Sequence, residues 1–503
     1  MTDQRASSPL RVVVLGGGTA GWMAACLFAH AWPQAQVTVI ESPDIGIVGV
    51  GEGSTPQLRT LFGKLGIPES DWMPAAHATF KLGIEFRGWS DRRGFQRYFH
   101  PFASAIDLHT EPQFHASARA RRTGRDVAAH PDRFFLNSRL AQRGLSPHAP
   151  QNFPFEIGYG YHFDAHLVGR VLAKRAGELG VEHRQDRVAQ VVVGEDGQVR
   201  HLLTEDGHAI VGDLFVDASG FRSMIAQQAL GAKFLPFASN LFNDRAVVMP
   251  TPKDDTLPPY TTATALSAGW VWRIPLRSRT GNGYVFSTRY TDPDQAEAEL
   301  RRHLGTLDDP TPARHLQMKV GRVADSWTAN CLAVGLAQGF IEPLEATALY
   351  LVQSTVEQFI RAYADGGFTP KHRDTFNRTV ARRYEGVRDY IVCHYRLNRR
   401  ADTPYWSDAA AMSDLSDDLK SVMTCWFTGG DLGAEIARLD IARYYAPLSW
   451  GCLLAGYGAF PADEKLRPAP SPADLAALDE FLDSCLLNFP PHAQALGSRA
   501  DAP

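Results

Sequence analysis

The first marked hydrophobic segment of the chain is a short apolar run at residues 12–15, VVVL. Four adjacent strand-forming residues without polar alternation are typical of a strand covered on both faces in a parallel sheet. Residues 22–29 are apolar and rich in alanine, which predicts a helix, and residues 36–40 predict a second strand. Strand, helix and strand in this order predict a parallel α/β unit.

Two later segments alternate between apolar and polar residues with period two, as β-strands do. In residues 78–89, ATFKLGIEFRGW, the apolar residues share one face, and the pattern makes Lys81 the polar side of an amphipathic strand. In residues 269–275, GWVWRIP, Trp270 and Trp272 share a face. Neighbouring indoles are more often core than part of a cofactor site, so packing alone accounts for this pair.

Helical spacing of apolar residues predicts helices at residues 161–179 and 344–363. Residues 107–133 are polar and irregular, and they predict an excursion from the main sheet. Beyond residue 370 long helical patterns take over, at 373–393, 414–428 and 472–487. We therefore expect an α/β fold in three parts: a Rossmann-like sheet domain at 1–370, a mainly helical subdomain packed on it as a cap at 371–490, and a disordered tail at 491–503.

Composition narrows the class of protein. The 503 residues are 44% hydrophobic, enough for a large core, and the formal charge of -4 favours neither nucleic acid nor an anionic membrane as partner. Six scattered cysteines form no metal-ligand spacing, so we expect reduced thiols and no metal site. No signal sequence or long apolar span is evident, which predicts a soluble cytoplasmic protein.

The turn after the first strand carries candidate chemistry. Gly16, Gly18 and Gly21 have the G-x-G-x-x-G spacing, and Glu41 ends the second strand, where a carboxylate can accept hydrogen bonds from ribose hydroxyls. The glycines permit a tight turn and close approach of the backbone to a pyrophosphate at the helix N-terminus. An ordinary glycine turn is the alternative, and the pattern does not choose between FAD and a nicotinamide cofactor.

Three further segments add to this picture. Residues 213–223, DLFVDASGFRS, form a second strand and small-residue turn around Asp217, and residues 49–56, GVGEGSTP, form a glycine-rich strap. The helix that follows Pro343 leaves free N–H groups in its first turn, which suits a small anion. Glu345 lies in that turn, where a favourable interaction with the helix dipole is the alternative to a catalytic role.

At GWVWRIP the chain resembles the flavin-dependent tryptophan halogenases and related aromatic halogenases, which carry a G-W-x-W-x-I-P signature. The same order of motifs includes the glycine turn, the strap, the strand of Lys81, His100-x-Phe102, DASGFRS and GFIEPLEAT. The resemblance extends over roughly residues 12–363 and is looser in the C-terminal helices. It implies a flavin monooxygenase-like FAD-binding fold.

The resemblance also implies a two-component enzyme. A separate flavin reductase supplies FADH2, which reacts with O2 to a flavin hydroperoxide, and chloride or bromide then yields hypohalous acid, HOX. HOX passes through an internal tunnel to an electron-rich aromatic, indole-like or tryptophan-like. Lys81 matches the family's essential lysine, acting through a haloamine or by hydrogen-bonding HOX, and Glu345 matches its partner carboxylate.

The expected site residues follow from this reading. FAD contacts are expected from Gly16, Gly18, Thr19, Ala20, Gly21, Glu41, Val50, Gly51, Asp217 and Leu336. Halide contacts are expected from Thr347 and Ala348. Substrate contacts are expected from His100, Phe102, Trp450, Tyr444 and Tyr445. The tunnel between flavin and substrate is expected to be lined by Trp270, Trp272, Ile274 and Pro275.

Two departures from the family pattern bear on the substrate. Many tryptophan halogenases read P-L-E-S-T-G where this chain has alanine at positions 346 and 348. Tyr444 and Tyr445 offer a tyrosine pair without a matching acid after them, so a smaller indole, a phenol or a carrier-held aromatic competes with free tryptophan. An FAD-dependent aromatic monooxygenase and a non-catalytic flavin-binding protein are the alternative functions; the chain is expected to be a monomer or homodimer.

Overall fold

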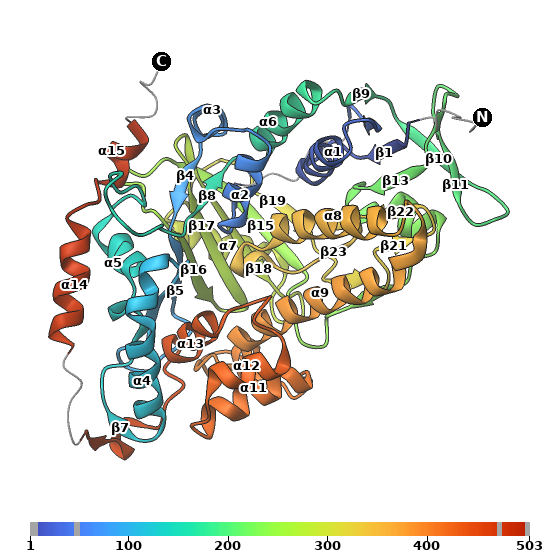
Figure 1. The fold of residues 1–503 in the computed structure, drawn as a ribbon. Coiled ribbons are helices and arrows are strands. Elements are labelled where there is room, and N and C mark those ends of the chain that lie inside the picture. The colour runs from blue at the N-terminus through green and yellow to red at the C-terminus, as the bar shows by residue number, and fades with distance from the viewer. Residues whose placement is uncertain (1–8, 45–50, 470–474, 498–503) are drawn as a thin grey trace.

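A six-stranded, mainly parallel sheet forms one side of the molecule (Figure 1). Its strands in spatial order are β21 (Trp327–Thr328), β22 (Cys331–Ala333), β13 (Leu214–Asp217), β1 (Arg11–Leu15), β2 (Gln36–Glu41) and β9 (Glu182–Gln185). The computed structural model describes residues 9–44, 51–469 and 475–497. Helix α1 (Thr19–Ala31) connects β1 to β2, which confirms the predicted strand, helix and strand.

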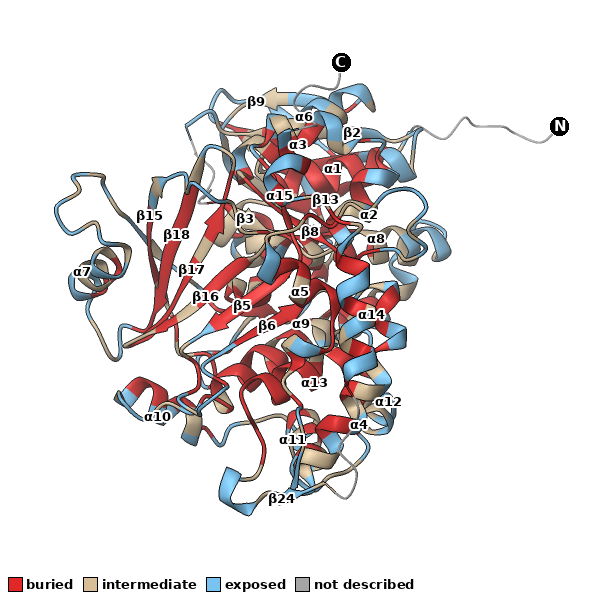
Figure 2. Ribbon diagram, turned by 90° about the vertical axis from the view of Figure 1, so that its left-hand side faces the viewer, coloured by how far each residue is buried: buried red, intermediate tan, exposed pale blue. Residues whose placement is uncertain are grey.

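A seven-stranded sheet forms the second layer. Its strands in order are β19 (Arg314–Gln317), β15 (Arg245–Pro252), β18 (Arg279–Phe286), β17 (Gly269–Pro275), β16 (Thr261–Leu266), β5 (Gly83–Arg87) and β6 (Arg97–Pro101). All neighbours are antiparallel except β16 and β5. Strand β17 has the bounds that the GWVWRIP pattern predicts. Figure 2 shows that most of this sheet is buried.

A three-stranded sheet joins the two sides, in the order β3 (Glu52–Gly53), β8 (Gly160–Phe163) and β4 (Thr79–Lys81). The single strand predicted at residues 78–89 is therefore wrong, because the chain changes sheets between β4 and β5 at Leu82. The polar face expected there is also buried: Lys81 is 1% exposed and Glu85 7%. Helix α6 (Ala165–Glu178) begins four residues later than predicted because β8 occupies residues 160–163.

Helices cover both sides of these sheets. They are α2 (Gln57–Lys64), α3 (Glu69–Ala75), α5 (Leu136–Arg143), α7 (Pro293–Leu304) and α8 (Ala348–Asp365). The prediction that residues 107–133 are irregular is wrong. They include α4 (Glu111–Arg122), whose buried Phe114, Ser117 and Ala118 lie at helical spacing. A peripheral sheet contains β10 (Val188–Val193), β11 (Val199–Thr204) and β12 (Ala209–Val211).

The C-terminal part is helical as predicted. It comprises α9 (Arg373–Arg396), α10 (Pro404–Ala411), α11 (Asp417–Phe427), α12 (Leu432–Leu439), α13 (Pro447–Gly456) and α14 (Ala476–Leu486). One buried hydrophobic cluster runs from β1 through these helices to the C-terminal segment, so they share a core with the sheets. None of the described helices is long and apolar enough to cross a membrane.

The predicted disordered tail is wrong as far as Gly497. Helix α15 (His492–Gly497) follows α14 and lies near β4 (Figure 1). His492 is 1% exposed, and its Nε2 accepts a hydrogen bond from the backbone N–H of Phe80 at 3.3 Å, while Nδ1 donates to the carbonyl of Leu257 at 2.6 Å. These partners are remote in sequence, which is why a polar C-terminal composition did not indicate them.

Candidate active site

The glycine turn between β1 and α1 has the geometry of a pyrophosphate site. Gly16 has φ of 120°, and a Cβ there would lie 2.3 Å from the carbonyl oxygen of Ala218, so only glycine fits between the two turns. A Cβ at Gly18 would meet no heavy atom within 4 Å, and no side chain caps the helix that begins at Thr19. The N–H groups of Thr19 and Ala20 therefore belong to an uncapped helix N-terminus.

Glu41 lies across this turn. A Cβ on Gly17 would come 1.6 Å from Oε2 of Glu41, and Oε1 is 2.8 Å from Nε2 of His183. The open surface above Gly18, the uncapped helix and this carboxylate together fit a dinucleotide such as FAD. The predicted contact Val50 lies outside the described residues.

Asp217 supports the site from within instead of facing it. Its buried carboxylate accepts hydrogen bonds from the Ser219 hydroxyl at 2.6 Å and from the backbone N–H groups of Ile225 at 2.9 Å and Ala226 at 2.8 Å. These bonds hold the second turn, whose Ala218 touches Gly16. Both oxygens of the Asp217 carboxylate are thus used within the protein, and neither is free for the predicted direct contact with flavin. We infer that Asp217 holds the second turn in place.

Two predicted cofactor contacts border neighbouring parts of the site. Leu336 follows Gly335, where an added Cβ would lie 2.8 Å from Cβ of Ala20, so this segment packs against the start of α1. Gly51 has φ of 84° and lies beside the end of β17, with an added Cβ 3.7 Å from Ile274. The strap therefore touches the predicted tunnel wall.

The tunnel wall itself is densely packed. Trp270 and Trp272 are 1% and 6% exposed, and their ring centroids are 6.1 Å apart. Trp270 Nε1 donates to the buried carboxylate of Glu342 at 2.9 Å, and Ile274 and Pro275 continue the buried strand. Burial raises the pKa of Glu342 against the effect of its hydrogen bonds. That this wall separates flavin from substrate, with a passage along it, stays a prediction.

Lys81 ends β4 inside the protein. Its Nζ lies 5.4 Å from the centroid of the Phe102 ring, and no hydrogen bond or ion pair to Nζ is found among the described residues. Burial lowers the pKa of Lys81 from 10.5 to about 7, and the negative charge of Glu345 opposes this shift. A lysine near its titration midpoint at neutral pH can hold or release a proton readily.

Glu345 lies in a short turn of 3-10 helix, Pro343–Glu345, before α8. Its Oε1 is 3.1 Å from Nδ1 of His100 and 3.0 Å from Nε2 of His394, and all three residues are buried. Burial alone would raise the pKa of Glu345, but the two histidines outweigh it and lower the value to about 2. The carboxylate is therefore ionised and held in place from two sides.

The predicted halide residues lie directly after Glu345. Ala346 has φ of 55°, a left-handed conformation that costs an alanine about 1 kcal/mol. It turns the chain so that Thr347 becomes the N-cap of α8 without any side-chain cap, and Ala348 is exposed. The first N–H groups of α8 are thus open to an anion, which fits the predicted role.

The predicted substrate residues form only part of one cluster. Tyr390 lies between His100, at 6.0 Å, and Trp450, at 4.8 Å between ring centroids, and it stacks on Tyr445 at 3.5 Å. Tyr390 therefore links His100 and Trp450, two of the predicted substrate residues. Tyr444 points away from Tyr445 and covers Gly386, where a Cβ would lie 2.3 Å from its ring.

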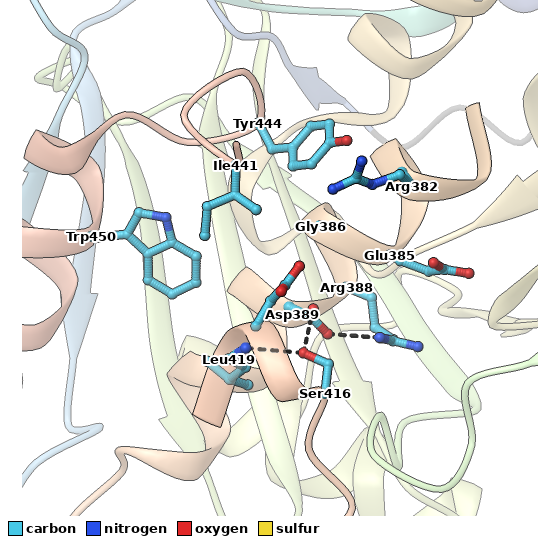
Figure 3. Close-up of a pocket in the computed structure, with 11 residues that line it drawn as sticks. Arg382, Glu385, Gly386, Arg388, Asp389, Ser416, Leu419, Ile441, Tyr444 and Trp450 are labelled. Carbon is cyan, nitrogen blue, oxygen red and sulfur yellow. Dashed lines mark hydrogen bonds and ion pairs between the residues drawn. The ribbon is translucent and has the colours of Figure 1, made fainter. Parts of the chain in front are cut away.

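A cavity of about 100 Å³ adjoins this cluster (Figure 3). Tyr444 and Trp450 form part of its wall, together with charged residues of α9 and α11 such as Arg382 and Asp389. Lys81 and Glu345 are not among the residues that line it.

Sequence reasoning missed His394 and Tyr390. Both lie on the buried face of α9, inside the run DYIVCHYR, where helical periodicity marks them only as core residues. The tyrosine and histidine stand one turn apart, at positions i and i+4, which is the available signal that two polar aromatic side chains share a buried face. No group of described His, Cys, Asp or Glu residues is arranged to hold a metal ion.

Comparisons with known proteins agree with this geometry. The profile of the tryptophan halogenase family matches residues 11–470. The chain is 36% identical over 499 residues to the 7-chloro-L-tryptophan 6-halogenase KtzR of Kutzneria sp. (strain 744), covering 93% of each chain.

Two solved structures have the same fold over nearly the full length. The flavin-dependent halogenase Xcc4156 from Xanthomonas campestris has a TM-score of 0.85 at 34% identity, covering 98% of this chain and 99% of that one. The tryptophan 6-halogenase SttH from Streptomyces toxytricini has a TM-score of 0.83 at 32% identity, covering 97% and 99%. The chain belongs to the tryptophan halogenase family of flavin-dependent halogenases.

Proposed function

We propose that the protein is a two-component, FADH2-dependent halogenase that acts on an electron-rich, indole-like aromatic. The observation that carries the proposal is a buried lysine, Lys81, that feels the charge of Glu345, whose carboxylate is ionised and held by two histidines. The fold, the family and the open helix N-terminus at Thr19 support it. FAD in its reduced form, supplied by a separate reductase, would provide with O2 and chloride or bromide the oxidised halogen as HOX.

Lys81 binds and orients HOX. A partly protonated amine can donate a hydrogen bond to the oxygen of HOX, which makes the halogen more electrophilic. The face of Phe102 favours the cationic form of the amine through its ring electrons. The aromatic carbon forms its bond to halogen while the oxygen–halogen bond breaks, and the oxygen leaves as water after accepting a proton.

Glu345 accepts the proton that the ring loses. Its oxygens are ionised because His100 and His394 compensate for the lost hydration. His394 is in turn fixed by the hydroxyl of Tyr457, 2.8 Å from its Nδ1. The histidines hold the carboxylate in position for this proton transfer.

The substrate is proposed to lie beside His100 and Phe102, against the aromatic cluster. Trp450 Nε1 and the Tyr445 hydroxyl are buried and have no hydrogen-bond partner among the described residues. They offer a polar substituent one donor and one donor or acceptor. An indole with a short polar substituent fits this chemistry, and halide is proposed to bind at Thr347 and Ala348.

The proposal is tested by supplying a flavin reductase, NADH, FAD, O2, bromide or chloride and a panel of indoles and phenols. We expect a mass increase of one halogen replacing one hydrogen. Hydroxylated product in the presence of halide would contradict the proposal in favour of a monooxygenase. Consumption of NADH without modification of any panel member would favour a non-catalytic flavin-binding protein.

Two variants assign the chemistry within that assay. We expect Lys81→Met to abolish halogenation while FAD still binds, and Glu345→Gln to lower kcat by about 100-fold, the usual effect of losing a proton acceptor. Lys420→Met, at an exposed position on α11, is the matched control and should retain full activity. Wild-type turnover by either site variant would remove that residue from the mechanism.

A further inference from the structure

A second buried carboxylate, that of Glu342, lies three residues before Glu345 and takes no part in the proposed chemistry. It directly precedes the 3-10 turn Pro343–Glu345, and its exposed fraction is 0%. Its backbone carbonyl accepts from the N–H of Leu344 at 2.9 Å, so a shift of Glu342 also moves the turn. A buried carboxylate is costly unless hydrogen bonds replace its lost hydration.

Three donors from separate elements supply these hydrogen bonds. Oε2 of Glu342 accepts from Nε1 of Trp270 in β17 at 2.9 Å and from Nδ2 of Asn243, which precedes β15, at 2.9 Å. It also accepts from the hydroxyl of Tyr395 in α9 at 2.5 Å. The amide of Asn243 is held in turn, because its oxygen accepts from the Tyr405 hydroxyl in α10 at 3.0 Å. Three donors on one oxygen fix the orientation of the carboxylate.

Helix α9 holds both carboxylates of this segment. Tyr395 donates to Glu342, and the residue before it, His394, has its Nε2 3.0 Å from Oε1 of Glu345. The turn between Glu342 and Glu345 is therefore attached at both ends to adjacent positions of one helix. The other donors attach its first end to β17 and to the segment before β15. The geometry thus connects the position of Glu345 to the hydrogen bonds of Glu342.

We propose that Glu342 is a positioning residue for Glu345. Its three hydrogen bonds fix the turn so that the carboxylate of Glu345 stays between His100 and His394 and can accept the proton that the ring loses. When these bonds are lost, the turn shifts and Glu345 moves away from one or both histidines. The inference rests on the proposed role of Glu345.

The groups around Glu345 make such a displacement measurable. With both histidines in place its pKa is about 2, and without them burial raises the value. Lys81 acts together with this carboxylate from β4. Further titratable groups that act with Glu345 are tyrosines whose pKa values burial raises well above 10, so they stay neutral: Tyr98, Tyr390, Tyr445 and Tyr457.

The first test measures kcat at pH 6 and pH 8. Glu342→Met keeps a side chain of similar length but has no oxygen to accept the three hydrogen bonds, whereas Glu342→Gln keeps one acceptor oxygen. In Glu342→Met we expect kcat at pH 8 to fall by about tenfold, because small displacements of a reacting group are costly. At pH 6 the loss should be larger by about another threefold, since Glu345 then begins to bind a proton. Glu342→Gln should restore most of the turnover and the wild-type ratio of the two rates.

Glu299→Met is the matched control for this test. The carboxylate of Glu299 also accepts three hydrogen bonds, from the N–H and hydroxyl of Ser267 and from the hydroxyl of Tyr284, but it lies on α7. We expect this variant to keep the wild-type ratio of rates at pH 6 and pH 8. The wild-type ratio in Glu342→Met would mean that Glu342 is only structural, and it would overturn the proposal. If Glu342→Met does not fold, Tyr395→Phe, which removes one donor, takes its place.

The second test requires neither FAD nor turnover, so it separates a failure of this inference from a failure of the proposed function. The free energy of unfolding of the apoprotein in urea is measured at pH 7 for wild type, Glu342→Met, Glu345→Gln and the double variant. We expect the effect of Glu345→Gln to be clearly smaller when Glu342 is replaced, since the carboxylate has then left its histidines. Equal effects in both backgrounds would contradict the proposal.

Discussion

At the scale of single residues, Lys81 is held under conditions that disfavour its charge. It is buried, its amine lies over an aromatic ring, and Glu345 is the acidic group that acts on it. Glu345 shows the opposite balance, because two histidines keep it ionised despite burial. Burial thus leaves Lys81 with a loosely held proton, whereas the two histidines keep Glu345 deprotonated.

This balance predicts a pH-dependent cost in stability. The pKa of Lys81 is about 7 in the folded protein and 10.5 when exposed. Between these values the unfolded chain binds the extra proton, so stability rises with pH; below pH 7 both states are protonated and the full penalty is present. In urea unfolding of the apoprotein, Lys81→Met should therefore be more stable than wild type at pH 6.5, with a difference that shrinks towards pH 10. A difference independent of pH would contradict the assigned pKa, and Lys420→Met provides the control for losing a lysine.

At the scale of elements, the turns and strand ends position most of the residues of the candidate site. The glycine turn after β1 rests on the turn braced by Asp217, while β8 joins the strap to the lysine strand. A substitution in one of these connections therefore affects the candidate site without replacing any of its residues.

A substitution in the glycine turn can show cofactor binding separately from folding. Gly18→Ala adds a methyl group where no heavy atom lies within 4 Å, so we expect an unchanged melting temperature for the apoprotein. The methyl group would keep pyrophosphate from backbone N–H groups, and a hydrogen bond to a charged group is worth about 1.5 to 3 kcal/mol. FAD affinity, followed by flavin fluorescence, should fall by about tenfold or more.

Gly177→Ala, a substitution with equal room in α6, is the matched control and should bind FAD as wild type does. Unchanged affinity in Gly18→Ala would exclude this turn as the pyrophosphate site.

Local sequence patterns correctly predicted those elements whose surroundings stay the same from one residue to the next along the element. The run at residues 12–15 and GWVWRIP each specify a strand without reference to distant residues, and β1 and β17 follow them. The burial of Lys81 depends on its pairing with β8, and the position of His394 depends on how α9 packs against Glu345. Periodicity reports only which residues share a face, so it could not place these contacts. The family motifs pointed to Lys81, Glu345 and His100 but not to His394 or Tyr390.

At the scale of the whole molecule, one core joins all described layers, and buried neutral histidines are part of it. Burial lowers the pKa of His492 to about 4, and it lowers the pKa values of His162 and His394 as well. Each of them binds a proton more readily in the unfolded chain. Their stabilisation is complete above pH 6.5 and is lost as pH falls.

We therefore expect the free energy of unfolding to change less with pH in His492→Gln than in wild type when the solution is acidified. The variant should be less stable than wild type at pH 7, because the bonds to Phe80 and Leu257 are weakened. Between pH 6.5 and about 4 it should lose less stability than wild type, since its titrating group is gone. Unfolding in urea across this range checks the prediction, with the exposed His30→Gln as control. Parallel curves for His492→Gln and wild type would contradict it.

The contact between α15 and the lysine strand also bears on how the protein is made. Phe80 and His492 are 412 positions apart, so nearly the whole chain is synthesised before the neighbour of Lys81 gains this partner. During translation β4 is made long before α15, and it lacks this partner until the ribosome has released α15. Expression conditions and fusion partners that delay or obstruct the C-terminal segment would thus lower the yield of active enzyme more than that of soluble chain.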